Sequence, residues 1–304
     1  MSVKTAYLFA ILGAALWGIT GLFVQNLYAY GFSAWDVVAI RSVFTVLLLL
    51  AYVLIFKRDA LYIRWKHIPL FIGSGVVSFV FFNWCFFTVM DQANISLAVV
   101  LLYTGPLFVT LLSRFLFKEL LTPRKTAAII VTLAGCGFVV GLFPSIDSVL
   151  TASTLLIGLG SGFFYALYSI FAKISSRHYH TITITTYSFI CATLFMVLSS
   201  QITHKVELFL NSSILLNSLG LALFPTVLAY LLYTKGLSQI ESSRASILST
   251  IEPVVAIGIG FFFFQDVLSL WQWFGVSLVI LSIILAAESP SKQAKMKKAS
   301  AQAM

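Results

Sequence analysis

The chain has 304 residues, of which 60% are hydrophobic and 10% charged, and its net charge is +9. Its mean hydropathy is +1.00. Water-soluble globular proteins carry about 25% charged residues, so this composition excludes that class. The three cysteines (Cys85, Cys136 and Cys191) all lie in apolar runs, where they indicate neither a disulfide framework nor a metal site.

Ten apolar runs are each close to the length of about 20 residues that crosses a bilayer. Backbone polar groups in lipid must be paired within their own segment, so these runs predict an all-α integral membrane protein. The first run is predicted to remain in the protein, because it is longer than the apolar part of a signal peptide. In chain order the predicted spans are residues 5–25, 35–56, 68–90, 96–117, 125–143, 154–173, 182–200, 214–235, 244–264 and 271–288.

The basic residues predict which ends of the spans face the cytoplasm. Of the 19 lysines and arginines, Lys205 alone falls on one side, Arg41 and Arg114 lie inside spans, and the rest collect on the other side. By the positive-inside rule both termini are cytoplasmic, in a multi-pass protein of the cytoplasmic membrane. This bias accounts for the net charge without a nucleic-acid partner.

The chain resembles itself when it is shifted by 147 residues. Pro106 then falls on Pro253 and Glu119 on Asp266, while Ser96-Leu97-Ala98 falls on Ser243-Arg244-Ala245. Each unit holds five spans, an odd number, so the second unit must enter the membrane from the opposite face. We therefore predict ten helices in two inverted-topology five-helix repeats, a plan that recurs in secondary transporters. The predicted units are residues 1–149 and 150–288, followed by a basic cytoplasmic tail, residues 289–304.

Charged residues inside spans are the first candidates for a site, because each is costly in a bilayer. Glu252 directly precedes Pro253, and we expect it either to carry a coupling proton or to make a structural hydrogen bond at a kink. Arg41 is expected either to orient an anionic substrate group or to pair with Asp36 or a helix end. Glu252 also belongs to a predicted stripe of small and polar residues on one helix: Ser242, Ala245, Ser249, Glu252, Ala256 and Gly260.

Aromatic and polar side chains within spans complete the candidate site. Tyr165 and Tyr168 lie on the same predicted helix face as Gly158 and Gly162, and buried tyrosine hydroxyls need partners. The further candidates are Trp17, Ser249, Tyr103, Asn83, Tyr187 and Tyr230. The Gly158/Gly162 spacing allows close helix packing, either within the fold or in a homodimer, so monomer and homodimer both remain open.

The motifs of several enzyme classes are missing from the sequence. It contains no HExxH zinc motif, no Walker motif and no GxSxG elbow. We therefore predict neither a cofactor nor a bound metal, and we expect a small-molecule substrate, with a possible coupling proton, rather than catalysis. The alternative is a non-transporting membrane protein, such as a lipid-handling enzyme or a scaffold.

Several stretches together resemble the drug/metabolite transporter superfamily, EamA type. They are Gly13–Gly18, Arg41, Ser96–Glu119 with its central Pro106, and Ser243–Asp266 with Glu252-Pro253. The resemblance covers residues 5–288, although Asp266 stands where the family more often has glutamate. It implies a cavity formed mainly by helices one to four and six to nine, with helices five and ten at the periphery. It also implies transport of small metabolites, often amino acids or amphipathic compounds, many of them outward by alternating access.

Overall fold

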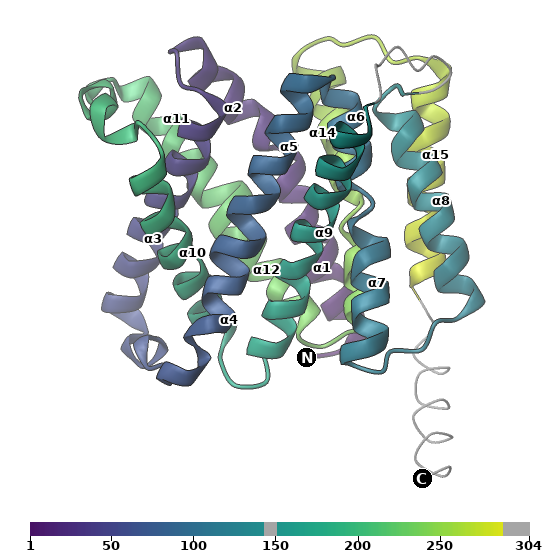
Figure 1. Ribbon diagram of the computed structural model, residues 1–304, viewed down its shortest axis with the longest axis horizontal. Helices are drawn as coiled ribbons and strands as arrows, with labels where there is room; N and C mark the ends of the chain where they lie inside the picture. Colours follow the sequence, from purple (N-terminus) through teal and green to yellow (C-terminus); the bar gives the residue numbers. More distant parts are fainter. Residues whose placement is uncertain (143–150, 288–304) are drawn as a thin grey trace.

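The computed structural model describes residues 1–142 and 151–287, and within these residues it contains helices and no strand. The helices run side by side between two ends of the molecule, with the N-terminus at the lower end in Figure 1. Eight helical segments in the described part are long and apolar enough to cross a membrane. Two shorter helices of 17 residues, α8 (Pro123–Val139) and α15 (Leu270–Ala286), take the place of the predicted fifth and tenth spans.

Three of the predicted spans are continuous helices, and five are interrupted. The continuous ones are α3 (Ala34–Phe56), α9 (Ala152–Ser175) and α10 (Thr181–Ser199). The first span is divided into α1 (Val3–Gly18) and α2 (Thr20–Ala29), the fourth into α6 (Ile95–Leu102) and α7 (Gly105–Leu116), and the ninth into α13 (Ser242–Leu248) and α14 (Ile251–Phe263). The third span comprises α4 (Ile68–Ile72), the π-helical η3 (Gly73–Val80) and α5 (Phe81–Gln92), and the eighth comprises α11 (Ser212–Ala222), the π-helical η5 (Leu223–Leu228) and α12 (Ala229–Leu237).

The prediction of one continuous ninth helix kinked at Pro253 is wrong. The helix stops at Leu248, and Pro253 lies in the first turn of α14, where a missing N–H leaves no intrahelical bond unmade. Pro106 likewise lies in the first turn of its helix, α7. The predicted small and polar stripe is therefore split by the turn at Ser249 and Thr250, and its two halves belong to different helices.

Several helix ends recur 147 residues apart. The N-cap residues of α3 and α10 are Ser33 and His180, those of α6 and α13 are Asn94 and Glu241, and those of α8 and α15 are Thr122 and Ser269. Lys118 and Gln265, also 147 apart, both have positive φ angles, of 56° and 58°. The local backbone thus repeats along with the sequence.

Glycines allow the closest helix contacts. A Cβ on Gly13 would lie 2.6 Å from the Ala229 carbonyl oxygen, so α1 packs directly on α12. Gly158 and Gly162 of α9 lie against Leu101 and Thr104, so this GxxxG pair serves contacts within the chain. Helices α8 and α15 pack against each other at one edge of the bundle (Figure 1).

Three sequence predictions fall partly or wholly outside the described residues. The loop between the fifth and sixth predicted spans (residues 144–153), which cytoplasmic termini would place outside, and the repeat boundary at 149/150 fall in or next to residues 143–150. The predicted basic tail falls within 288–304. The structure therefore leaves these predictions open.

Candidate functional site

A cluster of aromatic side chains occupies the middle of the molecule. The Trp17 ring on α1 lies 5.2 Å from the Tyr230 ring and 4.9 Å from the Tyr233 ring, both on α12, and 6.3 Å from the Tyr165 ring on α9 (centroid distances). The space remaining within the cluster, about 10 Å³, is too small for a substrate. This aromatic cluster, which consists of Trp17, Tyr165, Tyr168, Tyr230 and Tyr233, therefore closes the centre of the bundle in this conformation.

Two tyrosine hydroxyls of the aromatic cluster have polar partners within it. The Tyr168 hydroxyl is 2.7 Å from the Thr234 hydroxyl, and the Tyr233 hydroxyl is 2.8 Å from that of Ser169. Both hydrogen bonds join α9 to α12. The Trp17 Nε1–H is also buried, but it finds no acceptor among the described residues. A buried donor without an acceptor is costly, so this group is a candidate to bind a polar group of a ligand.

A larger cavity of about 370 Å³ adjoins the aromatic cluster on the side away from the N-terminus. Trp17 lines both spaces, and Glu252 and Tyr103 line the larger one. Much of the remaining wall is apolar, with Phe86, Ile95, Val99, Leu102, Val139, Val140 and Ile257. We call this space the Glu252 cavity. The first turns of α6 and α15 contribute to its wall through Ser96 and Gln272, so it reaches towards one end of the bundle.

Glu252 lies in the first turn of α14, where the helix dipole favours a negative charge. Its backbone N–H donates to the Ser249 carbonyl oxygen at 3.1 Å. Within the described residues its carboxylate makes no hydrogen bond or ion pair, so the structural hydrogen bond considered for it is not present. Ser249, by contrast, is buried and donates to the Ser246 carbonyl oxygen at 2.7 Å.

Arg41 lies in α3 at the edge of the aromatic cluster. Its Nε donates to the Thr226 hydroxyl at 2.8 Å and its Nη2 to the Pro225 carbonyl oxygen at 3.0 Å, so it satisfies polar groups of the π-helical η5. Its guanidinium carbon is 5.5 Å from the centre of the Phe79 ring and 5.9 Å from that of Tyr230. The pairing with Asp36 that the sequence left open is wrong.

Asp36 is used elsewhere, at the far end of the bundle. It forms a capping box with Ser33 and an ion pair of 2.8 Å with Lys205. That ion pair holds the first turn of α3 to η4 (Ile202–Leu210).

Two of the predicted site residues lie away from both spaces. The Tyr187 hydroxyl donates to the Leu61 carbonyl oxygen at 2.6 Å, and its ring packs against Phe71. The Asn83 amide donates to the Phe79 carbonyl oxygen one turn earlier in the same segment. The sequence prediction missed Tyr233, although its spacing of three residues from Tyr230 puts both on one helix face.

The end of the bundle near the N-terminus is held closed by a polar network. The Glu119 carboxylate, which follows α7, accepts hydrogen bonds from the backbone N–H groups of Ser242 (2.6 Å) and Ser243 (3.1 Å). It thereby caps the first turn of α13 from the other half of the chain. Lys125 lies 3.0 Å from Glu241, and Arg244 pairs with the same carboxylate.

Three further bonds extend this network, which we call the Glu119 network. Arg244 donates to the Ala286 carbonyl oxygen at 2.8 Å, and Lys173 donates to those of Leu237 and Ile240. Burial raises the pKa of Glu241, but the hydrogen bonds and charges of Arg244 and Lys125 outweigh it, so this pKa lies below its ordinary value. The Glu241 carboxylate therefore stays ionised at neutral pH.

A multi-pass helical bundle with an internal cavity, and with one end closed by a polar network, is the arrangement of a membrane transporter. The EamA-like transporter family model matches residues 4–141 and 152–287, and the chain belongs to that family. In the residues that the structure describes, no group of His, Cys, Asp or Glu side chains could hold a metal ion.

Curated relatives are named as transporters. The chain is 28% identical over 293 residues to the uncharacterized transporter YwfM of Bacillus subtilis (strain 168), covering 94% of this chain and 95% of that protein. It is 26% identical over 210 residues to the threonine/homoserine exporter RhtA of Salmonella typhimurium (strain SL1344), covering 69% of this chain and 66% of that protein. A solved crystal structure matches 94% of this chain and 97% of its own with a TM-score of 0.77 at 18% identity, which shows a shared fold.

Proposed function

We propose that the chain is a secondary transporter that moves small metabolites, amino acids or related amphipathic compounds, outward across the cytoplasmic membrane by alternating access. The observation that carries the proposal is the Glu252 cavity. It is lined by Glu252 and Trp17, and neither the carboxylate of Glu252 nor the buried indole N–H of Trp17 has a protein partner among the described residues. An amino acid brings an ammonium group for Glu252 and a carboxylate or apolar group for the rest of the wall.

The two ends of the bundle support alternating access. The Glu119 network closes the end near the N-terminus, while the Glu252 cavity reaches towards the other end. The repeated N-caps and the paired positive φ angles, all 147 residues apart, favour two like halves of opposite orientation. Rocking of such halves about a central site would open each end in turn.

Export in particular rests on one relative, and the charge bias supports the orientation of the chain in the membrane. RhtA is named an exporter of threonine and homoserine, which supports a small amino acid as the cargo. The positive-inside rule puts the closed end in the cytoplasm, with both termini on that side. No observation favours the non-transporting alternative.

Counterflow in proteoliposomes tests the proposal. Vesicles loaded with one unlabelled amino acid are diluted into the same radiolabelled amino acid, and the standard amino acids, with homoserine, are tried in turn. We expect transient accumulation of label for at least one small amino acid. Trp17→Phe keeps the ring but removes the unpartnered N–H, and should weaken apparent affinity about tenfold, which corresponds to about 1.4 kcal/mol.

Trp84→Phe is the matched control, because Trp84 is half exposed on the outside of the bundle and lines neither the aromatic cluster nor the Glu252 cavity. It should leave the kinetics unchanged. Failure of every amino acid in the panel, with protein that remains monodisperse and helical, would reject amino acids as the cargo. Equal effects of the two substitutions would reject the Glu252 cavity as the binding site.

A further inference from the structure

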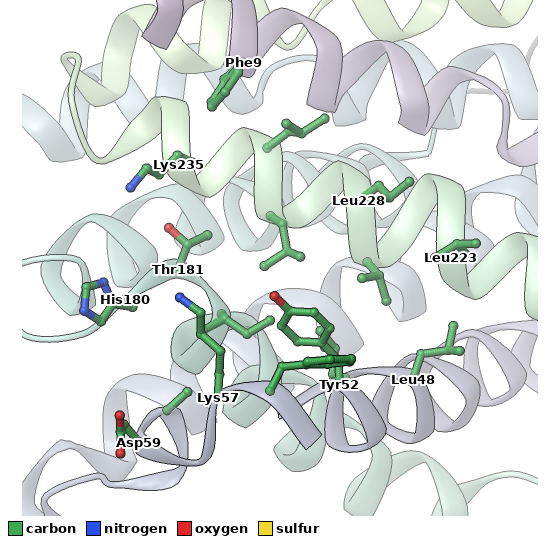
Figure 2. Close-up of a pocket in the computed structure, with 17 residues that line it drawn as sticks. Phe9, Leu48, Tyr52, Lys57, Asp59, His180, Thr181, Leu223, Leu228 and Lys235 are labelled. Atoms are coloured by element: carbon green, nitrogen blue, oxygen red, sulfur yellow. The ribbon is translucent and has the colours of Figure 1, made fainter. Parts of the chain in front are cut away.

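A second, larger cavity lies outside the proposed transport path. It has a volume of about 810 Å³ and runs between α3 on one side and η5 and α12 on the other. Leu48 and Tyr52 of α3 face Leu223 and Leu228 across it (Figure 2). We call it the α3–α12 groove. Its walls are mostly apolar, and Tyr52, Leu223 and Leu228 are each more than a third exposed on the side of the bundle.

The length of the groove matches one leaflet of a bilayer. On one wall it extends from Leu223 to Lys235, and on the other from Leu48 to Lys57. At 1.5 Å per residue these stretches span about 18 Å and about 14 Å. Half of the hydrocarbon thickness is about 15 Å. An acyl chain entering from the membrane surface would therefore lie alongside the groove down to about the bilayer midplane.

Positive charge collects at the surface end of the groove. Lys57, Lys235 and His180 lie together there, with Asp59 as the one acidic residue of the lining (Figure 2). Both lysines are exposed, and neither amine has a hydrogen bond or ion pair within the described residues. The other basic side chains of this end that approach a carboxylate, Lys125 and Arg244, belong to the Glu119 network.

The first turn of α10, also at this end, lacks the cap that its counterpart has. At α3 the N-cap Ser33 and the carboxylate of Asp36 form a capping box. At α10, 147 residues later, His180 and Thr183 occupy these positions and no side chain caps the helix. Thr181 of this turn lines the groove beside the lysines. Its neighbouring backbone N–H groups add to an environment that favours an anion.

We propose that the α3–α12 groove binds an anionic phospholipid of the leaflet on the N-terminal side. The phosphate lies between Lys57 and Lys235 at the start of α10, and one acyl chain follows the leucines towards Leu223. The groove has an apolar lining at the depth of the acyl chains and two lysines at the membrane surface, which fits this occupant. A free anion would leave the apolar lining without a partner, and a neutral lipid would leave the lysines unpaired. The site is independent of the Glu252 cavity and of the direction of transport.

Native mass spectrometry of the detergent-purified, full-length protein tests the proposal. The protein is titrated with phosphatidylglycerol and, separately, with phosphatidylcholine of the same acyl chains. We expect a saturable first phosphatidylglycerol adduct that binds more tightly than phosphatidylcholine. A lysine near the membrane surface contributes about 1 kcal/mol to binding an anionic lipid, so Lys57→Ala/Lys235→Ala should weaken this adduct about 30-fold.

Two matched variants decide between the possible occupants. Lys4→Ala/Lys66→Ala removes the same charge from the same end outside the groove lining and should leave the first adduct unchanged. Leu228→Trp fills the apolar wall and should displace the lipid without altering the charge. Equal loss in both lysine pairs would overturn the proposal in favour of general charge attraction. Full competition by glycerol phosphate, or an adduct insensitive to Leu228→Trp, would overturn it in favour of an anion site without an acyl chain.

Discussion

The carboxylates of Glu119, which follows α7, and Glu252, in the first turn of α14, have opposite environments. Glu119 is buried and fully engaged, with three hydrogen bonds to the first turn of α13. Glu252 faces the Glu252 cavity and has no side-chain partner among the described residues. A carboxylate that is already bound stabilises one conformation, whereas an unpaired one in a cavity can exchange a proton or bind a cation. This contrast assigns Glu119 to architecture and makes Glu252 the candidate for coupling.

Replacement of Glu252 by glutamine tests the coupling role. Glu252→Gln resembles the protonated side chain and cannot release a proton, so accumulation driven by a proton gradient should fall to the equilibrium level. Exchange at saturating substrate should persist, because it moves no net proton, although its apparent affinity should fall because an amide binds the ammonium group more weakly than a carboxylate does. Both are measured in proteoliposomes with and without an imposed pH gradient. Glu207→Gln, in the exposed η4, is the control, and gradient-driven accumulation by Glu252→Gln equal to that of the wild type would exclude Glu252 as the coupling residue.

Single residues were predicted from the sequence to different degrees. Glu252, Trp17, Tyr165 and Tyr230, which line the two central spaces, could be singled out from the sequence because a charge or a polar ring inside an apolar run is costly in a bilayer. The position of Tyr187 could not be predicted, since its partner is the carbonyl oxygen of Leu61, 126 residues away. The partners of Arg41 are likewise distant in sequence, the Pro225 carbonyl oxygen and the Thr226 hydroxyl of η5, 184 and 185 residues away, and no sequence pattern marks them.

At the scale of elements, the sequence predicted where helices lie better than where they stop. Apolar length located the eight described segments that are long enough to cross a membrane, because it reflects the thickness of the membrane, whereas α8 and α15 are shorter than that. The breaks at Ser249-Thr250 and Tyr103-Thr104 were missed, since both lie within apolar runs and proline was taken to kink a continuous helix. Proline restricts the residue before it and is well tolerated in a first turn, so it also starts a new helix.

The Glu119 network predicts how the closed end of the bundle responds to pH. The pKa of Glu241 is below its ordinary value, so its ion pairs stabilise the closed end at neutral pH and are lost only as the pH falls through that lowered value. On a background without the native cysteines, labelling of buried Ser246→Cys should stay slow from pH 7 to pH 5 and rise only as the pH falls through the lowered pKa of Glu241. Glu241→Gln should raise it about tenfold already at pH 7.

The labelling rate is compared with that of Gln239→Cys, an exposed position in the same turn region, to correct for the reactivity of the thiol. Circular dichroism in parallel separates opening of one end from global unfolding. An increase in Ser246→Cys labelling between pH 7 and pH 5 would contradict the assignment, because Glu241 is ionised throughout that range. No effect of Glu241→Gln would show that the Glu119 contacts alone hold the end closed.

At the scale of the whole molecule, the two ends of the bundle differ at equivalent positions. Asp266 lies 147 residues after Glu119 and follows an equivalent backbone turn, with its N–H donating to the Gly260 carbonyl oxygen as that of Glu119 does to Ser113. Ile95 and Ser96, the counterparts of Ser242 and Ser243, begin α6 at the other end. In this conformation the exposed Asp266 carboxylate is not bound to them, and the Ser96 hydroxyl donates to the Val140 carbonyl oxygen. If the halves are like and inverted, opening one end should bring Asp266 onto the first turn of α6.

Disulfide cross-linking of Ser96→Cys with Asp266→Cys, on a background without the native cysteines, tests this exchange of ends. Glu119→Gln keeps the size of the side chain but removes the charge that caps α13, so it should populate the opposite conformation. The yield of cross-link should then rise severalfold, while Glu207→Gln, an exposed change of the same kind, leaves it unchanged. A cross-link yield that stays constant when Glu119→Gln exposes Ser246→Cys to labelling would mean that one end opens without the other closing. Alternating access would then be wrong for this chain even if the Glu252 cavity binds substrate.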